Sequence, residues 1–404
     1  MSVTEATQRT RYKLVIVGGG SAGISVAARL LRQSRALIGQ IAIIDPASKH
    51  YYQPLWTLAG AGVVSRESTE RDEASVIPKG AVWIQDAVTK FLPQNNTIIT
   101  ASGKAVHYDF LVVAAGIQID WGKVKGLKEN IGKQGVCSNY SYDYVESTWE
   151  QIRHFQGGNA LFTNPNTPVK CGGAPQKIMY LADDSFRKTK VRSRSTVRFV
   201  SGAAAIFGVK KYAEALQKVI ERKQIETIFK HNLVEIVAEK KQAIFENLDT
   251  KAQVAMPYDM IHVVPPMSAP DFIKYSPLAA ADGWVDVDRF TLQHARFPNI
   301  FGIGDCTNLP TSKTGAAIRK QAPVVVQNVL SLLEGKPMTE RYDGYTSCPL
   351  VTGYGKLILA EFDYELNPRE TFPFDQSKER LSMYWLKKEL LPLMYWHGML
   401  PGKL

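Results

Sequence analysis

A glycine-rich turn near the N-terminus is the feature that most constrains the fold. A run of β-forming residues at 14–17 stops at glycines, and apolar residues at helical spacing follow from Ile24. Gly18, Gly20 and Gly23 occupy the three positions of a G-x-G-x-x-G turn. The first glycine permits the tight turn, the second lets a pyrophosphate approach, and the third lets strand and helix pack closely. The following helix start, at Ser21 and Ala22, would present free N–H groups to phosphates.

A second buried strand at 40–45 supports this interpretation, because it ends in an acidic residue. Asp45 follows Gly23 at about the 20-residue distance expected of a carboxylate that binds ribose hydroxyls. An ordinary strand–turn–helix is the alternative. The combined pattern predicts that the chain binds an adenine dinucleotide near its N-terminus.

Composition narrows the class of protein. With 404 residues, two domains are the better expectation. The net charge of +11 comes from dispersed basic residues, and no nucleic-acid module is present, so an anionic membrane surface or anionic substrate is favoured over nucleic acid. The polar segment 1–13 lacks the apolar core of a secretory signal, and no stretch of 18 uncharged apolar residues predicts a membrane-spanning helix.

The segment 46–64 is rich in aromatic residues, proline and glycine, and directly follows the strand that ends at Asp45. We expect it to line the ring end of the cofactor, with Gln53 and Pro54 as the contacts; plain loop packing is the alternative. Residues 82–88 and 97–100 are predicted strands, and Val88 is assigned to the cofactor site. Residues 107–116 form a buried strand ending in small residues, a pattern typical of flavoproteins with two dinucleotide domains.

A second Rossmann-like unit is predicted from about residue 158. Its expected elements are strands at 159–163 and 196–200 and helices at 174–186 and 209–222. Pyridine-nucleotide enzymes would carry a full glycine triplet here. After Gly202, however, the second position of the triplet is Ala204, and the next glycine is Gly208. The second nucleotide site is therefore interpreted as vestigial, which argues against NAD(P)H as the reductant.

The strand at 301–305 is expected to return the chain to the first domain. Asp305 at its end suits a carboxylate that binds the ribityl chain of FAD. The helix start that follows would approach the isoalloxazine C2 carbonyl, where its dipole and Lys313 would stabilise anionic reduced flavin. A solvated surface lysine is the alternative for Lys313. The helix-start residues assigned to the cofactor are Thr314, Gly315, Ala316, Ala317 and Ile318.

The four cysteines lack C-x-x-C or zinc spacing, so we expect no metal site. Cys171 and Cys348 are both predicted in loops that the topology can bring to the flavin face. A loop cysteine beside a lysine and a helix start should have a lowered pKa, which favours thiolate chemistry. Cys137 is interpreted as inert packing, and Cys306 as packing in the cofactor pocket.

The C-terminal segment 381–404 is rich in Trp, Tyr, Met and Leu, with two adjacent lysines, Lys387 and Lys388, in its first half. It is too short, charged and proline-broken to span a bilayer, but suits the headgroup boundary. The alternative is a helix docked on the protein core or on a second copy.

Longer motifs make the chain resemble the sulfide:quinone oxidoreductases, of the type that includes the mitochondrial enzymes and their bacterial relatives. The motifs are HYYQPLWTL at 50–58, NPNTPVKCGGAPQKIMY at 164–180, GIGDCTNLPTSKT at 302–314, YDGYTSCPLVTGY at 342–354 and FPFDQSKER at 372–380. The resemblance implies non-covalent FAD, redox cysteines at 171 and 348, and a quinone site near the C-terminal segment. Some relatives carry a third active-site cysteine in the first domain; this chain has none before Cys137.

The resemblance implies that sulfide attacks a disulfide formed between Cys171 and Cys348. The attack leaves a persulfide on Cys348 and a thiolate on Cys171, and this thiolate reacts with the flavin. The outer sulfur would pass to sulfite, glutathione or sulfide, and the electrons to a membrane quinone, with ubiquinone favoured. A type II NADH:quinone oxidoreductase and a catalytically silent membrane-bound flavoprotein are the alternatives.

The expected fold is α/β, with two Rossmann-like dinucleotide-binding domains, as in disulfide reductases, and an amphipathic, membrane-facing C-terminal tail. The expected segments are 1–130 and 295–345 for the FAD domain, 131–294 for the second domain, and 346–404 for the redox-cysteine loop and tail. A peripheral protein of the bacterial inner membrane is expected, because the amino end is short; the mitochondrial inner membrane is the alternative.

Overall fold

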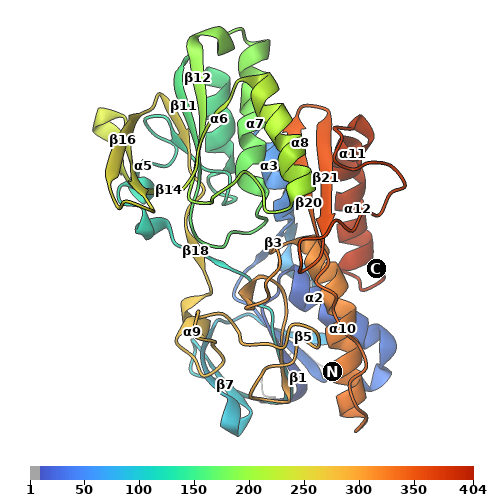
Figure 1. Ribbon diagram of the computed structural model, residues 1–404. Coiled ribbons are helices and arrows are strands. Elements are labelled where there is room, and N and C mark those ends of the chain that lie inside the picture. The colour runs from blue at the N-terminus through green and yellow to red at the C-terminus, as the bar shows by residue number, and fades with distance from the viewer. Residues whose placement is uncertain (1–9) are drawn as a thin grey trace.

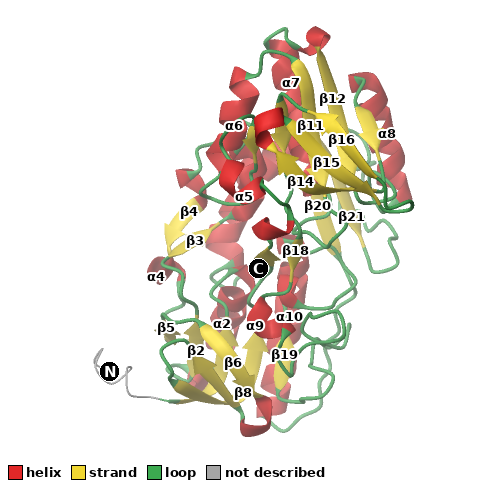
Figure 2. Ribbon diagram, turned by 90° about the vertical axis from the view of Figure 1, so that its left-hand side faces the viewer, coloured by secondary structure: helices red, strands yellow, loops and turns green. Residues whose placement is uncertain are grey.

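The computed structural model describes residues 10–404. Two α/β units lie one above the other in Figure 2, and Figure 1 shows the C-terminal hairpin and helical segment at one side of them. Both units are built on parallel sheets, so the expected fold class is confirmed. The polar segment before residue 10, on which the expectation of a bacterial location rested, lies outside the described residues.

The first sheet is mainly parallel and fully buried at its centre. Its strands are, in spatial order, β5 (Ala81–Ile84), β2 (Ile41–Ile44), β1 (Arg11–Val17) and β8 (Ala105–Val113), with β19 (Ile300–Gly302) parallel beside β8 and β7 (Thr97–Thr100) and β6 (Val88–Leu92) antiparallel. Helices α2 (Ser21–Gln33) and α10 (Gly315–Leu333) pack against each other. Near-continuous apolar runs suit strands buried on both faces. The single strand predicted at 82–88 is wrong, because the chain breaks between β5 and β6.

The second sheet is parallel throughout, in the order β10 (Val136–Cys137), β17 (Met260–His262), β11 (Gly158–Asn164), β12 (Ser195–Ser201) and β13 (Glu226–Ile228). Its helices are α6 (Val145–His154), α7 (Ala174–Lys188) and α8 (Lys210–Lys223). An antiparallel sheet of β14 (His231–Val237), β15 (Gln242–Asn247) and β16 (Gln253–Pro257) adjoins it. The strands and helices predicted here agree with the structure to within two residues at each end.

The chain crosses between the units at a two-stranded ribbon, β9 (Gln118–Ile119) paired with β18 (Met267–Ser268). Directly after β18, α9 (Asp271–Lys274) packs on the first unit, where the Phe272 ring lies 5.7 Å from the Phe91 ring. We therefore propose that the units meet near residues 120 and 269, rather than at 131 and 294 as the sequence predicted.

The C-terminal part begins with a hairpin of β20 (Thr346–Gly353) and β21 (Lys356–Phe362), which packs on α7. A helical segment then alternates α-helical and π-helical turns: α11 (Leu381–Trp385), η9 (Leu386–Leu390), α12 (Leu391–Met394) and η10 (Tyr395–Met399). In Figure 1 this segment runs beside α2. Among residues 10–404, no helix has the length and hydrophobicity needed to cross a bilayer.

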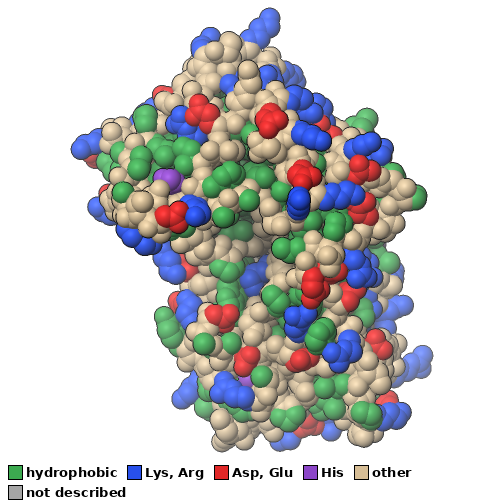
Figure 3. All heavy atoms as spheres, in the orientation of Figure 1, with side chains coloured by type: hydrophobic (Ala, Val, Ile, Leu, Met, Phe, Trp, Pro, Cys, Tyr) green, Lys and Arg blue, Asp and Glu red, His purple; other side chains and the backbone are tan. Residues whose placement is uncertain are grey.

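Short elements complete the fold and carry part of the site. They are β3 (Lys49–Tyr51), β4 (Glu70–Asp72), α3 (Trp56–Ala59), α4 (Glu73–Val76) and α5 (Leu127–Asn130). On the face drawn in Figure 3, Lys and Arg side chains are spread over both units, as the dispersed positive charge of the sequence predicts.

Candidate active site

Two cysteines that are 177 residues apart in sequence lie side by side. The Sγ atoms of Cys171 and Cys348 are 3.7 Å apart. Cys171 lies in the loop between β11 and α7, as predicted, whereas Cys348 lies in strand β20, so its predicted loop placement is wrong. At this separation the pair can act as one dithiol–disulfide couple, because only a small movement separates contact from an S–S bond.

Backbone contacts fix the position of Cys171. Its N–H donates to the carbonyl of Lys313 at 2.7 Å, and the N–H of Gly172 donates to Oγ of Ser312 at 3.2 Å. Cys171 also has a φ of +60°, a left-handed conformation that is costly for a side chain with a Cβ. The surrounding contacts hold this conformation, as is common at functional sites.

The two thiols are electrostatically different. Lys177, in the first turns of α7, places its Nζ 3.3 Å from the Cys171 sulfur. The hydrogen bond from Cys348 and the positive charge of Lys177 hold the pKa of Cys171 well below its usual value, despite burial. The same hydrogen bond, together with burial, raises the pKa of Cys348. The geometry thus favours a thiolate at Cys171 that accepts a hydrogen bond from the thiol of Cys348.

A lysine from the C-terminal segment completes the positive surroundings. Lys387 is only 4% exposed, and its Nζ donates to the carbonyl of Pro54 at 3.0 Å. Burial, and then repulsion from Lys177, lowers the pKa of Lys387 to about 7, while the two cysteines oppose this shift. The sequence interpretation placed Lys387 and Lys388 at a headgroup boundary. For Lys387 this interpretation is wrong, because its side chain points inward.

A half-buried lysine, Lys170, links the cysteine loop to the segment predicted at the cofactor's ring end. Lys170 donates from Nζ to Oε1 of Gln53 at 2.7 Å and lies 5.0 Å from the Trp56 ring centre. Burial lowers the pKa of Lys170 to about 8, against the opposing pull of Asp305. Lys170 and Lys387 therefore connect Gln53 and Pro54 to the surroundings of the cysteine pair.

The glycine-rich turn has the shape of a dinucleotide cradle. Gly18 has a φ of +108°, and a Cβ there would lie 2.4 Å from the carbonyl oxygen of Ala114. A Cβ on Gly23 would lie 1.9 Å from the carbonyl oxygen of Gly18, whereas around Gly20 the space is open. Asp45 accepts hydrogen bonds from the N–H of Gly19 and of Ala47, at 2.6 and 2.8 Å. These residues fit a bound pyrophosphate and ribose.

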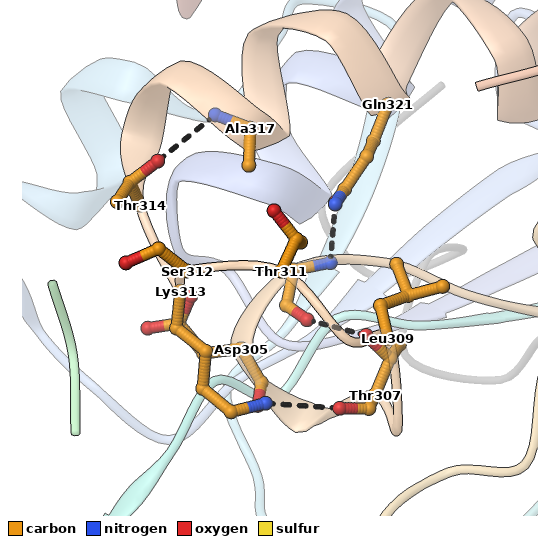
Figure 4. A pocket seen from close by; sticks show the side chains of 10 residues that line it. Asp305, Thr307, Leu309, Thr311, Ser312, Lys313, Thr314, Ala317 and Gln321 are labelled. Carbon is orange, nitrogen blue, oxygen red and sulfur yellow. Dashed lines mark hydrogen bonds between the residues drawn. The ribbon is translucent and has the colours of Figure 1, made fainter. Parts of the chain in front are cut away.

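The loop before α10 fits the opposite end of such a cofactor. Oδ1 of Asp305 is buried and has no hydrogen-bond partner within the described part of the chain, and removal from solvent raises the pKa of this carboxyl. Since an unsatisfied buried oxygen is costly, this atom suits a hydroxyl donor on a ligand. Lys313 donates to the carbonyls of Asp305 and Thr307 at 2.7 and 2.9 Å, and Thr314 caps α10 by accepting from the N–H of Ala317 (Figure 4).

Similarity to known proteins agrees with this geometry. The sequence model of the pyridine nucleotide-disulphide oxidoreductase family matches residues 12–146. The mitochondrial sulfide:quinone oxidoreductase of Mus musculus is 50% identical over 98% of this chain and 88% of its own length. That of Dictyostelium discoideum is 51% identical over 97% of this chain and 86% of its own length. The chain belongs to the sulfide:quinone oxidoreductase family.

The sulfide:quinone oxidoreductase family consists of flavoprotein oxidoreductases, and this chain is one of them. The X-ray structure of the sulfide:quinone oxidoreductase from Aquifex aeolicus shares its fold, with a TM-score of 0.83, 20% identity, and coverage of 98% of this chain and 92% of that chain. Motif-based recognition of the family from the sequence is therefore confirmed.

The remaining predicted positions differ in their exposure and in their place within the elements. Lys313 is half-buried, its Nζ is bound by two backbone carbonyls, and partial burial lowers its pKa, so it is not a solvated surface lysine. Ala317 and Ile318 are buried at the start of α10, whereas Gly315 is exposed and Ala316 is half-buried. Ser21 and Ala22 begin α2 directly after Gly20, and Val88 begins β6, four residues after β5 ends. Cys137 and Cys306 are buried, and burial raises the pKa of their thiols to about 12 and 11.

The strand order of the second unit shows which turn corresponds to a dinucleotide-binding position. Strand order makes β11 the central strand, so the turn after β11, rather than the one after β12, lies at the topological switch point where dinucleotides bind. The sequence interpretation examined Gly202 and Gly208, which follow β12. The turn at the switch point carries Cys171 instead.

Sequence reasoning missed several residues that this family member places at the site. They are Lys177, Lys387, His50, Glu73 and Tyr395. Only Lys177 had a usable signal, since a lysine in the first turns of the helix after Cys171 can reach back to the sulfur. Lys387 and Tyr395 reach the site only through the docking of a distant segment.

Proposed function

We propose that this chain oxidises sulfide through a Cys171/Cys348 disulfide–persulfide cycle and passes the electrons through FAD to a membrane quinone. The observation that carries this proposal is the 3.7 Å contact between the two sulfurs, with Nζ of Lys177 in direct contact with the sulfur of Cys171. Membership of the sulfide:quinone oxidoreductase family supports the substrates, because the relatives are named for sulfide and quinone.

The first step is a thiol–disulfide exchange. Hydrosulfide attacks Sγ of Cys348 in the oxidised pair, the S–S bond breaks, and Cys171 leaves as a thiolate. In such exchanges the sulfur with the lower pKa is the better leaving group. The lowered pKa of Cys171 supports this direction, and the persulfide then forms on Cys348.

The second step removes the outer sulfur. A nucleophilic acceptor such as sulfite, glutathione or sulfide attacks that sulfur, and Cys348 is released as a thiol. The two cysteines then re-form their disulfide, releasing two electrons and their remaining protons. With sulfite as acceptor, the overall reaction converts HS⁻, sulfite, quinone and one proton into thiosulfate and quinol.

When bound, FAD supplies a two-electron acceptor for the dithiol and a donor for the quinone. Gly18, Gly20 and Gly23, with Ser21 and Ala22, would hold its pyrophosphate, and Asp45 its adenosine ribose. Asp305 would accept from the ribityl hydroxyls, and the start of α10 with Lys313 would support the ring. Gln53 and Val88 complete the proposed contacts, as assigned from the sequence.

The Cys171 loop argues against a type II NADH:quinone oxidoreductase. It occupies the turn after β11, where a nicotinamide dinucleotide would need a glycine-rich cradle. We therefore propose that the second nucleotide site is vestigial. A catalytically silent flavoprotein is disfavoured too, since such a protein has no use for a stabilised thiolate beside a second thiol.

We propose a peripheral membrane protein. The C-terminal segment exposes Leu381, Trp385, Leu390 and Leu393, each about half exposed, and apolar side chains of this kind suit the headgroup boundary. The two relatives named above are mitochondrial, which favours the mitochondrial inner membrane over the bacterial membrane expected from the sequence.

Anaerobic titration of the purified protein with sulfide tests the function. Sulfide should bleach the flavin absorbance, and a soluble ubiquinone should restore it. Cys171→Ser and Cys348→Ser should abolish bleaching, while Cys137→Ala, at a buried cysteine away from the pair, should bleach as the parent does. Bleaching by NADH, or unchanged bleaching in both serine variants, would contradict the proposal.

A further inference from the structure

The C-terminal segment reaches the glycine-rich turn through one side chain. The hydroxyl of Tyr395 lies 2.6 Å from Oγ of Ser21 and 2.5 Å from Nε2 of His50. Ser21 is the first residue of α2, directly after Gly20. The segment therefore touches the helix end whose free N–H groups suit a pyrophosphate.

A buried carboxylate extends this contact toward the turn. Nδ1 of His50 lies 3.3 Å from Oε2 of Glu73, and both side chains are almost fully buried. The other oxygen, Oε1, has no hydrogen-bond partner among residues 10–404. A Cβ placed on Gly19 would lie 2.5 Å from this oxygen, so Oε1 borders the turn itself. An unsatisfied buried carboxylate oxygen is costly, and a hydroxyl donor on a bound dinucleotide would satisfy it.

Other contacts spread the same segment over the first unit. The Tyr395 ring lies 4.5 Å from the Tyr52 ring, and Trp396 stacks under the guanidinium of Arg71 at 4.8 Å. Gly402 packs so closely on α2 that a Cβ there would lie 2.7 Å from the backbone nitrogen of Arg29. The segment thus contacts both α2 and the ribbon of β3 and β4.

Two inward-pointing polar side chains of the segment, those of Lys387 and Tyr395, lie in π-helical turns. Lys387 lies in η9 and Tyr395 begins η10. A π-turn rotates the following residues around the helix axis and is frequent at functional positions. The outer face of the same segment is apolar and about half exposed at Leu390 and Leu393. One short segment therefore has a cofactor-side face and a membrane-side face.

We propose that residues 381–404 form a cofactor latch, in which Tyr395 closes the dinucleotide turn and bound FAD holds the segment in its membrane-binding arrangement. The inference rests on the proposed binding of FAD. Coupling between two sites is reciprocal, so whatever the latch contributes to FAD affinity, FAD contributes equally to docking of the latch. Protein without FAD should then bind membranes less tightly than protein with FAD.

The first experiment measures FAD release from Tyr395→Phe, which removes only the hydroxyl and keeps the ring. Loss of a buried hydrogen bond should speed release about three- to tenfold, followed by the rise in flavin fluorescence. Tyr384→Phe is the matched control, because Tyr384 is a buried tyrosine of the same segment that contacts neither Ser21 nor His50. It should release FAD at the parent rate, and equal release from Tyr395→Phe would overturn the latch.

The second experiment reverses the direction. FAD is removed from the parent protein and then added back. Two properties are measured in each state: the rate of trypsin cleavage after Lys387 and Lys388, and flotation with vesicles of phosphatidylcholine and phosphatidylglycerol. Stripped protein should be cleaved faster and float less, and added FAD should reverse both changes. Cleavage and flotation that ignore FAD would overturn the latch.

Failure of the latch and failure of the proposed function have different signatures. Purified protein that never holds flavin would contradict the function itself. Flavin that sulfide bleaches in Tyr395→Phe as in the parent, with unchanged release, would contradict the latch alone.

Discussion

The Nζ atom of Lys177 lies 3.3 Å from Sγ of Cys171, and no comparable cation touches Cys348 among the described residues. Cys348 is buried and Cys171 is half-buried, and the hydrogen bond between them and this lysine shift their pKa values in opposite directions overall. In the proposed cycle, this asymmetry favours Cys171 as the leaving thiolate and Cys348 as the cysteine that carries the persulfide sulfur.

Replacing Lys177 with Met should raise the pKa of Cys171, because the substitution removes a nearby positive charge and keeps most of the side-chain volume. A thiolate with a raised pKa is less populated near neutral pH, so sulfide should reduce the flavin about tenfold more slowly at pH 7 and recover at higher pH. Stopped-flow bleaching across pH measures this shift. Lys218→Met, at an exposed position of α8, is the control, and an unshifted profile for Lys177→Met would contradict the assignment.

Alkylation should distinguish the four cysteines of the reduced protein. Cys171 combines a lowered pKa with partial exposure, whereas burial raises the pKa of Cys137 to about 12 and of Cys306 to about 11. Iodoacetamide at pH 7 should therefore modify Cys171 first, since the thiolate is the nucleophile. Peptide mass spectrometry gives the order, and earlier modification of Cys348 would reverse the roles of the pair.

Lys387 should make stability depend on pH in a particular direction. Its pKa falls from 10.5 to about 7 on folding, mainly through burial, so between those values the unfolded chain binds the extra proton. The buried charge therefore costs stability below pH 7, and the cost is relieved as pH rises toward 10.5. At 1.36 kcal/mol per pKa unit, the cost is at most about 5 kcal/mol.

Lys387→Met should accordingly raise the Tm most at pH 6 and progressively less towards pH 10. Scanning calorimetry of the flavin-loaded protein measures the difference. Lys388→Met, at the neighbouring and less buried lysine, should show no such trend. A Tm gain that is constant with pH would show that Lys387 is not the titrating group.

Local patterns were sufficient for the first unit, because the strand, the glycine turn and α2 follow each other directly in sequence. Cys348 was misplaced in a loop because Pro349 reads as a turn residue, while the strand depends on pairing with β21, where Cys348 lies opposite Ala360. The turn of the second unit was sought after β12 for a similar reason. Spatial strand order, which makes β11 central, is set by long-range pairing that no local pattern contains.

The site shows the same division between local and distant information. The glycines, Asp45 and Cys171 were predicted, since each depends on its immediate neighbours. Lys387 was interpreted as a lysine at the headgroup boundary because of the amphipathic composition of its segment. Composition alone does not show which side chains of the segment point toward the protein.

That outer face leads to a final prediction about membrane binding. Leu390→Glu and Leu393→Glu together place two charges on an exposed apolar surface, where each leucine is about half exposed. Charges that cannot enter the headgroup boundary should reduce flotation on phosphatidylcholine–phosphatidylglycerol vesicles at least tenfold. Turnover with a water-soluble quinone should remain, because neither side chain faces the cysteine pair. Leu366→Glu is the matched control, since Leu366 is equally exposed outside the segment and should leave flotation unchanged; equal losses in both variants would contradict a membrane role for the segment.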